Sequence, residues 1–164
     1  SSSFTLKILA KKLVQNLHHC TLPHTRHPSN MTMAPYLNFN GDCEAAFQFY
    51  QSALNGKLGE LFRYAGSPME TEVPADWKNK IMHGSVTVAG QTLMGADNVP
   101  GQYEQPKGFS LALNIKGAAE AERIFHALAE AGKIIVPLEK TFWAERFGMV
   151  IDRFGIPWAV NGEA

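Results

Sequence analysis

Two stretches of the chain show the same order of apolar and polar patterns. In each, a short alternating segment typical of a strand precedes a segment with apolar residues at spacings of three and four, which is typical of a helix. Three further alternating segments follow that helix. The first stretch covers residues 34–98 and the second covers residues 108–162, with a linker containing Pro and Gly at residues 99–107. The pattern therefore predicts two β-α-β-β-β modules.

In the first module we expect strands at residues 35–39, 57–64, 80–88 and 91–97, with a helix between Asp42 and Gly56. Asp42 can accept hydrogen bonds from the unpaired amide groups of the first helical turn. Gly56 can take the left-handed conformation that ends many helices. One face of this helix is continuously apolar and is expected to pack on the sheet, through Cys43, Ala46, Phe47, Tyr50 and Leu54.

The second module repeats this plan, with strands expected at residues 108–115, 133–138, 145–152 and 156–161 and a helix over residues 118–131 that ends at Gly132. Its last two strands are joined by Arg153-Phe154-Gly155, a turn with glycine where a positive φ is needed. Since each sheet packs only one face on its helix, two such sheets that curl together enclose a cup. We expect an α+β fold in which the modules form a cupped mixed sheet, closed within one chain or across a dimer.

A cup of this kind is where a small ligand would bind. Open strand edges and exposed aromatic loops also favour a partner, and the simplest partner is a second copy of the chain. We therefore expect a small-molecule ligand and a homodimer.

Composition excludes several other classes of protein. The chain has 164 residues, equal numbers of basic and acidic residues, and two cysteines. Two cysteines are too few for a disulfide framework, and they suit a reducing cytoplasm. A net charge of zero gives no reason to expect a nucleic-acid partner, and the absence of an 18-residue apolar run gives none to expect a membrane span.

Residues 1–33 differ in kind from the rest. They contain Lys7, Lys11, Lys12 and Arg26 and no acidic residue, and we expect a flexible basic leader or extension. It can be an extension that precedes a start at Met31 or Met33, a targeting segment, or a docking helix. A cluster of histidines and one cysteine suits a transition metal, although a solvated tail is the simpler interpretation: His18, His19, Cys20, His24 and His27.

Four segments carry a resemblance to a known family. They are residues 35–50, Ile81-Met82-His83, Thr141-Phe142-Trp143, and residues 152–158 with the sequence Asp-Arg-Phe-Gly-Ile-Pro-Trp. Over residues 34–162 the chain resembles the PhnB-like, or demethylubiquinone methyltransferase-like, branch of the vicinal oxygen chelate superfamily, which includes glyoxalase I, bleomycin resistance proteins and extradiol dioxygenases. No Gly-x-Gly turn joins a strand to a helix, so we do not expect methyltransferase chemistry with a nucleoside cofactor.

The resemblance also implies where a metal would be held. Enzymes of the superfamily bind a divalent cation through four His or Glu side chains on the first and last strands of the two modules. The matching places in this chain fall at or near Pro35, Met94, Phe109 and Ala159. None of these supplies an imidazole or carboxylate, and shifting the match by one residue does not recover a set. We therefore expect no metal and no other cofactor.

His83 is the strongest candidate for chemistry. It shares one face of its strand with Ser85 and Thr87, and it can act as a general acid or base or can simply be a hydrogen-bonded strand residue. The candidate ligand-binding residues alternate along strands, and each can face the cup or a helix instead: Leu37, Phe39, Met94, Phe109 and Leu111. Trp143 lies in an aromatic loop that can form a lid or a dimer contact.

The remaining ionisable residues have simpler interpretations. Asp97 and Asp152 end strands and are expected to cap the turns that follow them, with a place at the cup mouth as the alternative. Cys43 lies on the apolar helix face and is expected to be an inert buried thiol. His126 is expected to be an ordinary surface residue. Glu139, Glu145 and Arg146 give the aromatic loop its charge.

The function expected from these observations is that of a PhnB-like protein that binds a small, largely apolar or aromatic molecule in the cup, without the four-ligand metal site. Whether it also catalyses a reaction stays open. One alternative is a metal-dependent isomerase, lyase or dioxygenase-type enzyme with unusual ligands such as His83, Asp97 or Glu139. Another is a resistance-type protein that sequesters a drug.

Overall fold

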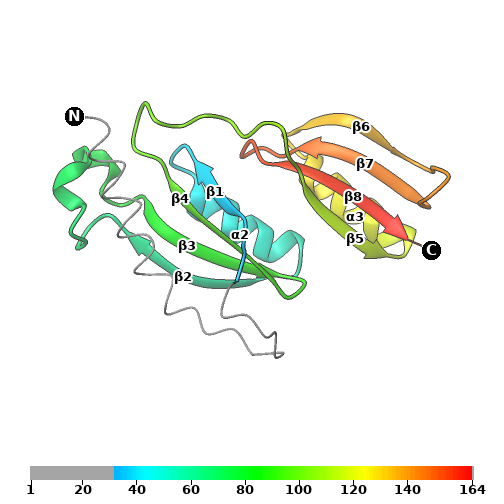
Figure 1. Cartoon of the computed structure of the whole chain (residues 1–164), viewed down its shortest axis with the longest axis horizontal. Coiled ribbons are helices and arrows are strands. Elements are labelled where there is room, and N and C mark those ends of the chain that lie inside the picture. The colour runs from blue at the N-terminus through cyan, green and yellow to red at the C-terminus, as the bar shows by residue number, and fades with distance from the viewer. Residues whose placement is uncertain (1–31, 164) are drawn as a thin grey trace. The chain divides into compact units, whose positions relative to one another are not determined.

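The fold consists of two modules with the same order of elements, as seen in a computed structural model that describes residues 32–163 (Figure 1). The predictions for residues 1–31, including the His-Cys cluster, lie outside the described residues. The elements of the first module are β1 (Tyr36–Phe39), α2 (Cys43–Ala53), β2 (Lys57–Arg63), two short 3-10 helices (Glu70–Glu72 and Ala75–Trp77), β3 (Ile81–Val88) and β4 (Gln91–Asp97). Those of the second are β5 (Leu111–Lys116), α3 (Ala118–Ala129), β6 (Lys133–Glu139), β7 (Arg146–Ile151) and β8 (Pro157–Glu163).

Each module forms its own four-stranded mixed sheet. The strand orders are β1-β4-β3-β2 and β5-β8-β7-β6, with the first strand of each module parallel to the last and the other pairs antiparallel. The α+β class and the β-α-β-β-β order are therefore confirmed.

One helix covers one face of each sheet. The predicted apolar face of α2 is confirmed, since Cys43, Phe47 and Tyr50 are fully buried in the core. In α3, Phe125 and Leu128 have the same role. Burying such side chains stabilises the fold by about 1.5–3 kcal/mol each. In the part of the chain that the structure describes, no helix has the length and apolar character that a bilayer span requires.

Two expectations about helix ends were wrong. The residues with positive φ after the helices are Asn55 (51°) and Ala131 (54°), not Gly56 and Gly132. Glycine is needed at position 132 for another reason, because a Cβ there would lie 2.5 Å from the carbonyl oxygen of Ile151. The prediction that Gly155 takes a positive φ is confirmed, at 84°.

The start of α2 also differs from the expectation. The Asp42 side chain makes no capping hydrogen bond. Instead, Oδ1 of Asp97 on β4 accepts a hydrogen bond of 2.8 Å from the amide of Cys43, and its Oδ2 accepts one of 2.8 Å from the amide of Ile81. Asp97 therefore caps the helix from a distant strand and does not cap the turn that follows it.

A second buried carboxylate joins the two modules. Asp152, at the end of β7, accepts hydrogen bonds from the amides of Phe154 and Ile156, which confirms its role in the turn. It also accepts hydrogen bonds from Trp158 Nε1 and from the hydroxyl of Tyr50 on α2. Because Tyr50 belongs to the first module and Asp152 to the second, this group fixes how α2 lies against the second module.

Candidate functional site: the uncovered sheet faces

Among residues 32–163, the helices leave one face of each sheet uncovered, and side-chain alternation decides which residues lie there. On β1, Leu37 and Phe39 are 1% and 0% exposed and belong to the core. Successive strand residues point to opposite faces, so Tyr36 and Asn38 lie on the uncovered face. The expectation that Leu37 and Phe39 line the ligand site was therefore wrong, because both pack beneath α2.

Leu111 on β5 also faces the helix side of its sheet. It packs against the core of its module, as do Leu113 and Ile115. Its proposed contact with a ligand was wrong for the same reason, since its strand presents Ala112 and Asn114 to the uncovered face.

Met94 keeps its place on the uncovered face of the first sheet. It is half-buried, and it pairs with Tyr36 on β1 and with Ser85 on β3. Phe109 precedes β5 and is 47% exposed, while Trp143 lies in the loop before β7 and is 56% exposed. Nothing in the fold tests their contact with a ligand, so their roles stay predictions.

His83 lies between two aromatic rings on the uncovered face. Its ring stacks with Tyr36 at a centroid distance of 5.9 Å and with Phe62 at 6.3 Å, with interplanar angles of 24° and 23°. Tyr36 lies on β1, His83 on β3 and Phe62 on β2. We name them the aromatic-imidazole cluster. The sequence analysis missed Tyr36 and Phe62, although Tyr36 alternates with two core residues, which was a usable signal.

The electrostatics of the aromatic-imidazole cluster favour uncharged groups. Burial raises the pKa of Tyr36 and lowers the pKa of His83 from its ordinary value of 6.5. At neutral pH the imidazole is therefore neutral and the phenol keeps its proton. The Tyr36 hydroxyl lies 3.2 Å from Nδ1 of His83 and can donate a hydrogen bond to it. In that tautomer Nε2 carries the proton and can donate to a ligand.

The uncovered face of the second sheet is more apolar. Gly148 and Val150 on β7 are buried on the side of α3, so Phe147 and Met149 lie opposite to them. On β8, Asn161 shares this face and its Nδ2 donates a hydrogen bond of 3.1 Å to Oδ1 of Asn114. Among residues 32–163, no donor reaches the buried Oδ1 of Asn161.

The aromatic loop of the second module is exposed. Trp143 packs edge-on against Phe142 and Phe147, with ring centroids 4.5 and 5.5 Å apart. Glu145 pairs with Lys140 at 2.9 Å. Such exposed ion pairs contribute little to stability.

The residues at the places where the resemblance implies a metal site cannot act as its ligands. Pro35, Met94, Phe109 and Ala159 supply no imidazole or carboxylate. Within residues 32–163, no three His, Cys, Asp or Glu side chains converge on one point. Asp97 is engaged by two amides. No step of a mechanism is therefore assigned to a metal, and the expectation of a metal-free site stays a prediction.

Two other ionisable residues take the places expected of them. Cys43 is fully buried, and burial raises the pKa of its thiol, which keeps it protonated and unreactive. His126 lies on the exposed side of α3. Neither contributes to the uncovered faces.

A family comparison agrees with the geometry. The sequence model of the family described as 3-demethylubiquinone-9 3-methyltransferase matches residues 31–161. The chain belongs to this PhnB-like family. Protein YjdN of Escherichia coli is 36% identical over 140 residues, which cover 80% of this chain and 95% of that protein.

Solved structures support the same assignment. Protein PA1353 from Pseudomonas aeruginosa is 48% identical with a TM-score of 0.73, and the match covers 82% of this chain and 98% of that one. The PhnB protein from Bacillus cereus, a putative 3-demethylubiquinone-9 3-methyltransferase, is 25% identical with a TM-score of 0.70 over 80% and 99%. The fosfomycin resistance protein FosX of Listeria monocytogenes, at 10% identity over 83% and 95% with a TM-score of 0.57, shares the fold. The chain is thus a PhnB-like member of the vicinal oxygen chelate superfamily.

Proposed function

We propose that this PhnB-like protein binds a small, uncharged, largely aromatic molecule on the uncovered face of its first sheet, without a metal. The observation that carries the proposal is the aromatic-imidazole cluster, in which His83 lies between Tyr36 and Phe62. Flat aromatic side chains stack on planar ligands, and a few placed polar groups orient the ligand within an apolar surface.

Each group of the cluster has a separate role. Phe62 is 46% exposed and offers a ring surface for stacking. Tyr36 sets the tautomer of His83 by donating to Nδ1. His83 then donates from Nε2 to a hydroxyl or carbonyl oxygen of the ligand. Burial lowers the pKa of His83, so the imidazole stays neutral at neutral pH and keeps this donor role.

In this proposal the uncovered face of the second sheet forms the other wall of the ligand site. Phe147, Met149 and Trp143 present an apolar surface there. We propose that a second copy of the chain places this surface opposite the aromatic-imidazole cluster and closes the ligand site, since exposed apolar faces of this kind favour association. Measurement of the mass of the full chain in solution tests this step, and a monomer at 100 μM would refute it.

Methyl transfer is not part of the proposal, although the description of the matching family names it. The chain has no Gly-x-Gly turn between a strand and a helix that would hold a nucleoside cofactor. The groups on the uncovered face are suited to stacking and to one hydrogen bond.

Binding of 2-naphthol, naphthalene and cyclohexanol by calorimetry tests the proposal. We expect 2-naphthol to bind most tightly, because it combines a planar ring with a hydroxyl. His83→Phe keeps a stacking ring and removes the hydrogen bond, so we expect it to abolish the preference for 2-naphthol over naphthalene. His126→Phe changes an exposed histidine on α3 and is the matched control.

Two results would count against the proposal. The first is that cyclohexanol binds as tightly as 2-naphthol, or that His83→Phe and His126→Phe behave alike. The second is stoichiometric zinc, nickel, manganese or iron in the purified protein that is lost in His83→Ala, which would instead support the metal-dependent enzyme.

A further inference from the structure

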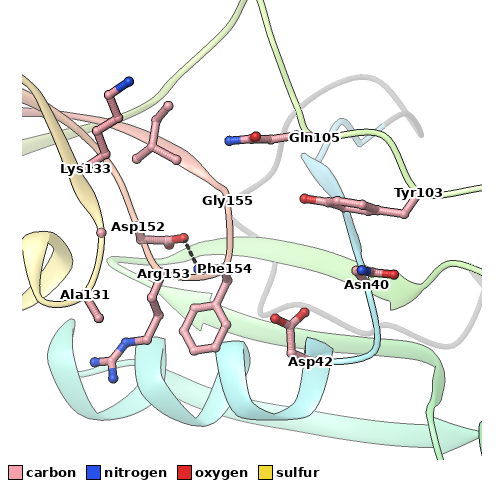
Figure 2. Close-up of a pocket in the computed structure, with 12 residues that line it drawn as sticks. Asn40, Asp42, Tyr103, Gln105, Ala131, Lys133, Asp152, Arg153, Phe154 and Gly155 are labelled. Carbon is pink, nitrogen blue, oxygen red and sulfur yellow. Dashed lines mark hydrogen bonds between the residues drawn. The ribbon is translucent and has the colours of Figure 1, made fainter.

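A groove separate from the aromatic-imidazole cluster lies where the loop after β4 passes the turn between β7 and β8 (Figure 2). Its volume is about 420 Å³, which suits a small molecule. The start of α2, the loop and the turn each contribute lining residues. Most of the side chains around it are polar, among them Asn40, Asp42, Tyr103 and Gln105.

The Asp42 carboxylate does not cap α2. The helix that begins beside it is capped by Asp97. Among the described residues, no donor reaches the buried Oδ1 of Asp42, and the side chain makes no cap hydrogen bond. Figure 2 shows the carboxylate pointing into the groove. Burial raises its pKa, although the backbone amides of Asp42 and Asn40 favour its charged form. A buried carboxylate oxygen without a donor is costly unless a bound group compensates its charge.

Two side chains of the loop point into the same space. Figure 2 shows the Tyr103 hydroxyl and the Gln105 amide both directed toward the turn that contains Gly155. A Cβ at Gly155 would lie 2.9 Å from the Tyr103 hydroxyl, so the loop packs closely on this glycine. Asp42, Tyr103 and Gln105 thus offer the groove a carboxylate, a phenol and an amide.

Negative charges act on both Asp42 and Tyr103. The pKa of Asp42 is raised by burial and by the nearby charge of Asp97. The pKa of Tyr103 is raised by burial and then by Asp42 and Asp152. Burial is the larger cause in both cases, and the smaller contribution from neighbouring carboxylates is the part that a bound positive charge would offset.

Lys133 and Arg153 line the groove, but their charged groups are directed away from Asp42. Arg153 places its guanidinium 4.4 Å over the ring of Phe49 and 3.7 Å from Glu130, away from Asp42. Lys80 Nζ donates to the carbonyl of Gly41 at 2.6 Å and is only a minor cause that lowers the pKa of Asp42. In Figure 2 the side chain of Lys133 extends away from the groove.

We propose that this groove binds a small organic ammonium ion. The ammonium group donates to the Asp42 carboxylate, and the Tyr103 hydroxyl and the Gln105 amide offer hydrogen bonds to the rest of the molecule. The site is distinct from the aromatic-imidazole cluster, and the two can fail independently.

The experiment uses the full chain and three probes of matched length: putrescine, butane-1,4-diol and succinate. Binding is followed by the amide resonances of Gly155 and Tyr103 in ¹H–¹⁵N spectra. We expect putrescine to shift both resonances in a saturable way, and we expect the diol and succinate to have no effect at the same concentration. Asp42→Asn should weaken putrescine binding at least tenfold.

Two variants act as controls. Glu104→Gln removes an acidic residue of the same loop that does not line the groove, and it should leave putrescine binding within twofold of the unchanged chain. His83→Phe should also leave it unchanged. Since Asp42 makes no cap hydrogen bond and burial raises its pKa, Asp42→Asn should not lower the melting temperature, which separates loss of binding from loss of fold.

Several outcomes would overturn the proposal: no saturable shift with 10 mM putrescine, equal shifts with butane-1,4-diol, or equal weakening by Asp42→Asn and Glu104→Gln. The last result would show that putrescine responds only to net charge. A loss of putrescine binding in His83→Phe would place the site on the sheet face instead.

Discussion

Replacing Asp152 with Asn tests whether one buried carboxylate holds the two modules together. Its Oδ2 accepts the Tyr50 hydroxyl at 2.6 Å and Trp158 Nε1 at 2.8 Å, and its Oδ1 accepts the amides of Phe154 at 2.9 Å and Ile156 at 3.0 Å. An asparagine side chain has one oxygen and one NH₂ group. In either orientation, the NH₂ group faces two donors that a carboxylate oxygen satisfied.

The magnitude follows from the number of hydrogen bonds lost. Hydrogen bonds to charged groups contribute about 1.5–3 kcal/mol each, and a buried donor left without an acceptor costs about 1–3 kcal/mol. Two such bonds are lost, so we expect Asp152→Asn to lower the free energy of unfolding by about 3–6 kcal/mol. Tyr50→Phe removes one donor and leaves the carboxylate with three, so we expect a loss of about 2 kcal/mol.

Urea unfolding followed by tryptophan fluorescence measures both changes, because the free energy of unfolding falls linearly with urea concentration. Glu130→Gln is the matched control, since Glu130 is exposed and lies 3.7 Å from Arg153 in the same turn. It should change the free energy of unfolding by no more than about 0.5 kcal/mol. If Asp152→Asn costs less than Tyr50→Phe, the assignment of four hydrogen bonds to this carboxylate is wrong.

Three further predictions concern pH, backbone and salt. The folded-state pKa of His83 lies below its unfolded value of 6.5, so the unfolded chain binds more protons just below pH 6.5 and stability falls as the pH falls there. In urea titrations, the free energy of unfolding lost between pH 7.5 and pH 5.5 should be smaller for His83→Phe than for the unchanged chain. An equal loss would contradict the burial of this imidazole. Ala131→Gly should stabilise the fold by about 1 kcal/mol, because Ala131 has a φ of 54°. Gly132→Ala should destabilise it by about 1–3 kcal/mol through contact with the Ile151 carbonyl. A lower melting temperature for Ala131→Gly, or a higher one for Gly132→Ala, would refute the assignment of these two positions. Binding of 2-naphthol should be unchanged between 20 and 500 mM salt while putrescine binding weakens, because only the second depends on opposite charges, and a salt-sensitive 2-naphthol affinity would show an ionic contact that the cluster lacks.

Local patterns predicted the elements of the fold well, because strand and helix periods depend on neighbouring residues. The apolar face of α2, including Phe47 and Tyr50, follows directly from spacings of three and four. The cap of that helix did not follow, because Asp97 lies 54 positions after Cys43 and reaches it only through the parallel pairing of β1 and β4. Sequence reasoning chose the nearest carboxylate, Asp42.

The candidate site was predicted less well because alternation fixes two faces of a strand without saying which one the helix covers. Leu37 and Phe39 are the more apolar pair on β1, and the helix covers the more apolar face. The same rule, applied earlier, would have placed Tyr36 on the uncovered face. Its contact with His83 across β4 needed the strand order as well.

The distribution of carboxylates explains why the two candidate sites favour different ligands. Asp97 and Asp152 are both buried and fully engaged with donors of the fold, so neither projects charge onto the uncovered faces. The aromatic-imidazole cluster is left with neutral groups, since burial keeps the phenol protonated and the imidazole unprotonated. Asp42 differs because Asp97 has taken over its capping role. A carboxylate that makes no capping hydrogen bond, at the edge of a groove, favours a cationic ligand. A sheet face with neutral stacked rings favours an uncharged aromatic ligand.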